Sequence, residues 1–106
     1  MKPAQYLKRF GEKMAILLET TTKKNKDYSG DVDAFSNFLM VEHLGISSVE
    51  QGILVRMTDK MARASNLILN QDGKAQVNDE SIIDTLDDLS VYSQILAIYI
   101  ENKNKK

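Results

Sequence analysis

The chain has 106 residues, with 14 Lys and Arg against 15 Asp and Glu, so its formal net charge at pH 7 is −1. The absence of cysteine and the single histidine exclude disulfides, thiolate zinc sites and a cysteine nucleophile, and argue against a Ser-His-Asp triad. Because no apolar run reaches the ~18 residues of a membrane span and the first ten residues lack a signal-peptide core, we expect one cytoplasmic domain, residues 1–106, with no membrane partner.

The first predicted helix covers about residues 3–23. Pro3 suits its first turn, where a missing backbone N–H has no cost. The apolar residues that follow recur every three or four positions, as in an amphipathic helix, and they are Tyr6, Leu7, Phe10, Met14, Leu17, Leu18 and Thr21. Residues 1–26 hold seven Lys and Arg against two Glu, whereas residues 27–101 hold four against thirteen acids. This basic helix is either a solvated exterior or a surface that attracts phosphate or an acidic partner.

Residues 25–33, NKDYSGDVD, predict a loop because Asn, Asp, Ser and Gly cluster there and Gly30 can adopt a positive φ. The segment contains Lys26, Asp27 and Tyr28. Tyr28 has two interpretations at this point: its ring folds onto the core, or it stacks on a nucleotide base.

Two helices are predicted next, over residues 34–44 and 48–70. Asp33 is a suitable N-cap for the first, and Gly45 is a suitable residue just after its end. The second opens on Ser47-Ser48-Val49-Glu50, which has capping-box spacing. Its expected buried stripe is Ile53, Leu54, Met57, Met61, Ala64 and Ile68. Beside this runs a polar stripe, either solvated or suited by its three cations to a polyphosphate, made of Arg56, Asp59, Lys60, Arg63, Asn66 and Asn70.

The last predicted helix, residues 79–102, begins with a cluster of carboxylates. On a 3.6-residue helix, one stripe is formed by Glu80, Asp84, Asp87 and Asp88, and the opposite stripe by Ile82, Leu86, Leu89 and Ser93. The second half, VYSQILAIYI, is apolar nearly all round, so we expect a subunit interface to cover it. Four helices with short connections and no period-two alternation predict an all-α four-helix bundle that is completed by homo-oligomerisation.

The acidic stripe has two interpretations. Acids in a first helical turn interact favourably with the helix dipole, which explains Asp79 and Glu80 better than Asp87 and Asp88. Alternatively, carboxylates three and four residues apart can converge on Mg²⁺ or Mn²⁺ and leave room for phosphate oxygens. The sequence has no glycine-rich phosphate loop, so the cations of the polar stripe are the candidates for holding phosphates.

Three segments, KNKDYSGD…FSNF, RMTDKMARASNLI and VNDESIIDTLDDLSVY, resemble in this order the motifs of the phage-associated all-α family called nucleotide-modification-associated domain 1. The resemblance covers roughly residues 24–92 and implies a nucleotide-linked role in a phage or prophage, and hence in the host cytoplasm. A second similarity is to the MazG-like nucleoside triphosphate pyrophosphatases, helical oligomers that hold magnesium with E-x-x-E and E-x-x-D. Asp84-Thr-Leu-Asp87 is similar to the second element, but the first is missing, and Arg56-Met-Thr-Asp59 stands about in its place.

The expected function is nucleotide binding, with Mg²⁺-dependent (or Mn²⁺-dependent) cleavage of a triphosphate to a monophosphate and pyrophosphate as the further expectation. The candidate nucleotide-binding residues are Lys26, Asp27, Tyr28, Asn37, Arg56, Lys60 and Arg63. The candidate metal ligands are Glu80, Asp84, Asp87 and Asp88, and the candidate catalytic residues are Asp59 and Asp84. The alternatives are a non-enzymatic module that sequesters a nucleotide signal or inhibits a host defence protein, and a purely structural role. Nucleic acid is not an expected partner.

Overall fold

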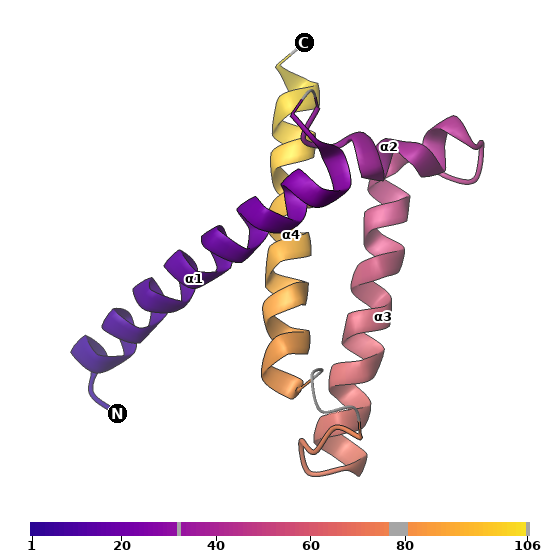
Figure 1. Cartoon of the computed structure of the whole chain (residues 1–106). Helices are drawn as coiled ribbons and strands as arrows, with labels where there is room; N and C mark the ends of the chain where they lie inside the picture. Colours follow the sequence, from indigo (N-terminus) through magenta and orange to yellow (C-terminus); the bar gives the residue numbers. More distant parts are fainter. Residues whose placement is uncertain (32, 77–80, 106) are drawn as a thin grey trace. The chain divides into compact units, whose positions relative to one another are not determined.

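A computed structural model describes residues 1–31, 33–76 and 81–105, and these residues form four helices and no strand (Figure 1). The helices are α1 (Pro3–Ser29), α2 (Ser36–His43), α3 (Val49–Asn70) and α4 (Ile82–Asn104). The predicted all-α class is confirmed. None of the described helices is long and apolar enough to cross a membrane. The chain divides into two compact units, residues 1–37 and residues 38–106.

In the first unit, α1 continues through the segment that was predicted to be a loop. The Thr22 hydroxyl donates to the Leu18 carbonyl (2.8 Å), and Lys23 pairs with Glu19 one turn earlier (3.3 Å). These local contacts satisfy the polar side chains within the helix, so the run of threonines and lysines does not end it. The helix ends at Gly30, which has a φ of 70° and donates its backbone N–H to the Lys26 carbonyl (3.1 Å). The loop prediction is therefore wrong for residues 25–29.

After Gly30 the chain folds back onto the last turn of α1. The Asn25 side chain donates to the Ala34 carbonyl (2.7 Å), and the Ser29 hydroxyl donates to Asn37 Oδ1 (2.7 Å). Asp33 accepts the backbone N–H of Phe35 (2.8 Å), so an Asx turn precedes α2 and the helix begins at Ser36 rather than at residue 34. Within α1 no described residue is buried, and the apolar stripe predicted from the sequence is largely exposed.

In the second unit, a tight turn joins α2 to α3. Gly45 has a φ of 73° and stands just after α2, as predicted, and the Ile46 N–H donates back to the Val41 carbonyl (2.9 Å). Ser48 then caps α3 in a reciprocal capping box with Gln51, one residue later than the spacing predicted. A Cβ placed on Gly52 would lie 2.9 Å from Val41 Cγ2, so the two helices approach closely there.

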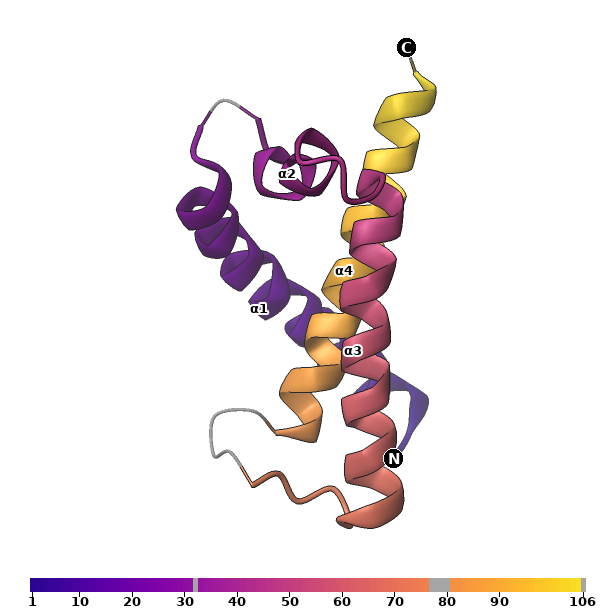
Figure 2. The ribbon, with the colours of Figure 1, turned by 90° about the vertical axis from the view of Figure 1, so that its right-hand side faces the viewer.

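The core of the second unit lies between α3 and α4, which run side by side in opposite directions in both views (Figure 1 and Figure 2). Its fully or nearly fully buried residues are Val49, Ile53, Ala64, Leu67 and Thr85, with Phe38 of α2 beside them. At one end of the pair, Lys103 near the end of α4 contacts Glu50 in the first turn of α3 (2.9 Å). This ion pair joins the two helices at that end.

Candidate functional site

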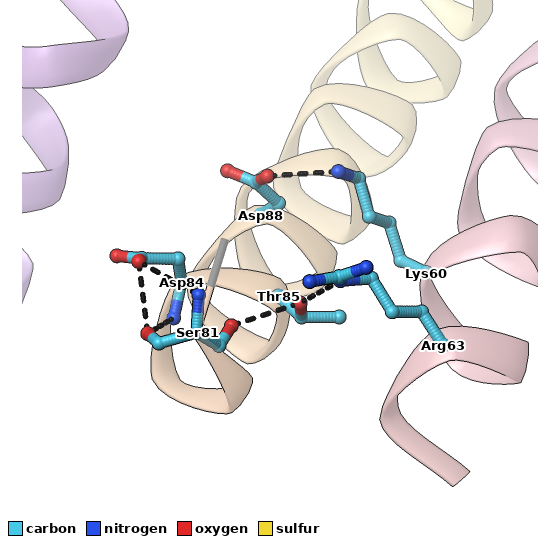
Figure 3. Close-up of polar contacts among 6 residues, drawn as sticks. All are labelled: Lys60, Arg63, Ser81, Asp84, Thr85 and Asp88. Carbon is cyan, nitrogen blue, oxygen red and sulfur yellow. Dashed lines mark hydrogen bonds and ion pairs between the residues drawn. The ribbon is translucent and has the colours of Figure 1, made fainter. Parts of the chain in front are cut away.

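The polar stripe of α3 meets the acidic half of α4 (Figure 3). Lys60 Nζ lies 3.0 Å from Asp88 Oδ2, and Arg63 donates its Nε–H to Thr85 Oγ1 (3.1 Å). The side chains of Lys60 and Asp88 are 31% and 34% exposed, so solvent reaches the ion pair without surrounding it. We call these four residues the polar edge. The structure thus brings two of the predicted phosphate-binding cations together with one predicted metal ligand.

Thr85 is the residue of the polar edge that the sequence analysis missed. It is 2% exposed, and its Oγ1 donates to the Ser81 carbonyl (3.0 Å) while accepting from Arg63. This pattern uses the hydroxyl proton and one lone pair, so the rotamer of Thr85 and the direction of the Arg63 side chain are fixed together. A polar residue four positions before Leu89, on a helix with an apolar stripe, is the signal that would have identified it.

Asp84 has a structural role at the start of α4. Its backbone N–H donates to Ser81 Oγ (3.1 Å), and its carboxylate accepts from the Ser81 N–H (3.2 Å) and hydroxyl (2.8 Å). This is a reciprocal capping box, and the carboxylate lies in the first turn, where the helix dipole favours an anion. Figure 3 shows the Asp84 carboxylate on the Ser81 side, away from Arg63. The Ser-x-x-Asp spacing was readable in the sequence.

The predicted metal ligands form no convergent group in the part of the chain that the structure describes. Glu80 lies outside the described residues, and among the described ones no three His, Asp or Glu side chains could hold one ion. Asp84 is engaged by its capping box, Asp88 contacts Lys60, and Asp87 is half-buried. The described carboxylates thus do not converge on one point in this arrangement, and metal binding stays a prediction.

The other candidate residues lie at three further places. Arg56 stacks its guanidinium over the Phe38 ring, with 4.7 Å between Cζ and the ring centroid, and Asp59 is exposed on α3. Three candidates stand in the last turns of α1, within the first unit, and all of them are exposed: Lys26, Asp27 and Tyr28. Asn37, also in the first unit, accepts from Ser29. The candidate nucleotide-binding residues are therefore divided between the two units.

The polar edge offers cationic donors that are already oriented toward an anion and a hydroxyl. Such a surface can bind phosphate oxygens through charge-assisted hydrogen bonds. Comparison of the chain with known proteins finds no family model, curated protein or solved structure that matches it.

Proposed function

We propose that the protein binds a nucleotide through its phosphates, with Lys60 and Arg63 as the principal contacts and Arg56 one turn away. The observation that carries this proposal is the Lys60–Asp88 pair at 3.0 Å, beside an Arg63 side chain that Thr85 orients. The Asp88 carboxylate shows where an anion is accommodated next to Lys60. Because Thr85 already holds Arg63 in place, a phosphate group that binds Arg63 costs little side-chain entropy there.

The sequence motifs support a nucleotide as the source of the phosphate. The three segments that resemble nucleotide-modification-associated domain 1 include RMTDKMARASNLI, which carries all three cations, and VNDESIIDTLDDLSVY, which carries Asp88. The net charge of −1 argues against a nucleic-acid polymer, whose binding depends on neutralising many phosphates at once. A mononucleotide requires only a local cluster of cations, which the polar edge supplies.

Isothermal titration calorimetry with ribo- and deoxyribonucleoside triphosphates in EDTA tests the proposal. Lys60→Ala and Arg63→Ala should each weaken binding by at least about tenfold, as the loss of a charge-assisted hydrogen bond implies. Lys105→Ala is the matched control, because it removes an exposed lysine of the same unit far from the polar edge in sequence. A wild-type protein that binds none of the triphosphates, or an Arg63→Ala protein that binds as well as wild type, would refute the proposal.

A second candidate, cleavage of the bound triphosphate to a monophosphate and pyrophosphate, is favoured by one observation. Asp87 and Asp88 lie beyond the first turn of α4, where the helix dipole no longer accounts for acids. Asp88→Asn separates the two functions. If Asp88 only competes with phosphate for Lys60, the variant should bind more tightly than wild type in EDTA. If Asp88 serves a magnesium-dependent reaction, the variant should lose pyrophosphate release in magnesium.

Asp84→Asn is a better probe of hydrolysis than Asp84→Ala. The asparagine oxygen can still accept the Ser81 hydrogen bonds, so the start of α4 is kept while the charge is removed. Unchanged pyrophosphate release in Asp84→Asn would remove Asp84 from the reaction. Absence of pyrophosphate from the wild-type protein would leave nucleotide binding as the proposed function.

A further inference from the structure

The α3–α4 pair has an apolar face that is separate from the polar edge. On α3 it consists of residues that follow one another at steps of four and three, namely Leu54, Thr58, Met61, Ser65 and Ile68. On α4 it consists of residues at steps of three and four, namely Ile83, Leu86, Ser90, Ser93, Ala97 and Ile100. We call these two rows together the outer apolar face. Alternating steps of three and four are the spacing of a helix-packing seam.

The outer apolar face is largely exposed, although most of its surface is apolar. Its large apolar side chains are each at least 40% exposed, and none of its residues is charged. The Thr58 hydroxyl donates to the Val55 carbonyl (2.7 Å), and the Ser93 hydroxyl donates to the Leu89 carbonyl (3.0 Å). Burial of these two hydroxyls therefore leaves no donor unsatisfied. An exposed apolar surface of this extent marks an interaction site.

The two rows lie on the same face of the helix pair. At about 100° per residue, Met61 lies on one side of the buried Ala64 around α3, and Arg63 lies on the other. Around α4, Leu86 likewise lies on one side of the buried Thr85, and Asp88 lies on the other. Because Lys60 contacts Asp88, the polar sides of the two helices share one face. The apolar sides consequently share the opposite face.

We infer that the outer apolar face packs against the same face of a second copy, so that two α3–α4 pairs form a four-helix bundle about a twofold axis. Two identical faces without charged residues meet with no like-charge pair. The middle of the α4 row is made of small side chains, Ser90, Ser93 and Ala97, and on α3 Thr58 and Ser65 stand on either side of Met61. Small residues at these positions let helix backbones approach closely, and Met61 and the larger residues at the row ends can pack around them.

The size of the face fits a second helix pair. The 22 residues of α3 span about 33 Å, and two neighbouring helices are about 20 Å wide, so the face measures about 650 Å². A standard protein–protein interface buries about 800 Å² per partner. A single amphipathic helix has one apolar stripe and would cover about half of this width. A second copy covers both rows at once.

Sedimentation velocity over a wide range of protein concentration tests the inference. The wild-type chain should be a dimer, and Met61→Glu and Leu86→Glu should each raise its dissociation constant at least about tenfold, because each places an unpaired charge in the interface. Asn66→Glu is the matched control, since it adds the same charge at an exposed position of α3 outside the face. Far-UV circular dichroism checks that each variant keeps its helices. A monomeric wild-type chain, or a dimer that both variants leave intact, would overturn the inference.

Thiol protection gives a second measurement that needs no disruptive charge. The chain has no cysteine, so Ser65→Cys and Ser90→Cys each introduce one thiol in the middle of a row. In the dimer these thiols should react more slowly with a maleimide than Asn66→Cys does, and the difference should shrink on dilution. Equal rates for the three thiols at high protein concentration would overturn the inference even if the glutamate variants fail to fold.

Discussion

Thr85→Val tests whether the hydroxyl of Thr85 holds Arg63 in place. Valine keeps the volume of the buried side chain but removes the oxygen that accepts from Arg63 Nε and donates to the Ser81 carbonyl. Ser81 keeps the backbone hydrogen bond from the Thr85 N–H (3.0 Å), so the main loss is the contact with the charged Arg63. A hydrogen bond to a charged group contributes about 1.5–3 kcal/mol, and the half-buried Arg63 can recover part of this from water. We therefore expect a loss of about 1.5 kcal/mol.

Urea unfolding followed by circular dichroism, at one fixed protein concentration, measures this loss. A double-mutant cycle with Arg63→Met isolates the contact, and the coupling energy with Thr85→Val should be about 1 kcal/mol. Thr85→Ser is the control, because it removes a buried methyl but keeps the oxygen, and its coupling with Arg63→Met should be near zero. A coupling energy for Thr85→Val below about 0.3 kcal/mol would refute the assigned role of Thr85.

Three further predictions concern stability. The hydrogen bond from Lys103 lowers the pKa of Glu50 below its ordinary value of 4.5 and raises the pKa of Lys103 above 10.5, so their pair stabilises the fold between these values. The difference in urea midpoint between wild type and Glu50→Gln should be largest near neutral pH, fall as acid protonates Glu50, and fall again as alkali deprotonates Lys103. Ser81→Ala should cost about 1 kcal/mol in urea unfolding through loss of the N-cap, and an unchanged midpoint would contradict the capping role. Gly11→Ala has open space around the new Cβ, so it should stabilise the helix by up to about 1 kcal/mol, seen as a higher helix content in circular dichroism. Gly52→Ala should give no gain in stability, because overpacking against Val41 costs about 1–3 kcal/mol.

The helices could be predicted from the sequence because their signals are local. Gly45 ends α2 through its positive φ, and Ser48 and Ser81 cap the helices that follow them. The end of α1 was misplaced because Asn, Asp and Ser favour turns only when their side chains compete with the helix backbone. Here the Asn25 side chain instead donates to the carbonyl of Ala34, so it stabilises the helix end. Composition does not distinguish these two outcomes.

The candidate site could be predicted in part. The polar stripe of α3 and the acids of α4 were identified from helical spacing, and the structure brings Lys60 and Asp88 together. Spacing along one helix does not determine which groups meet across two, so the contact between Arg63 and Thr85 was missed. The role of Asp84 depends on where α4 begins. The predicted helix started at residue 79, which places Ser81 and Asp84 inside the helix, so their capping box was not predicted.

Helical periodicity identified the apolar stripes of α3 and α4, but it did not predict which of their residues are buried within one chain. Ile53 and Ala64 are buried as predicted, but Leu54, Met61 and Ile68 of the same stripe are each about half exposed. On α4, Leu86 of the stripe opposite the acids is 42% exposed. These four exposed residues, Leu54, Met61, Ile68 and Leu86, all lie on the outer apolar face. A helix that packs against two neighbours has an apolar sector centred between them, so its strongest stripe does not mark the face buried within one chain. The displacement of the stripes toward the outer apolar face is thus what a two-copy bundle would produce, and it favours an interface along the whole of α4 rather than over its second half alone.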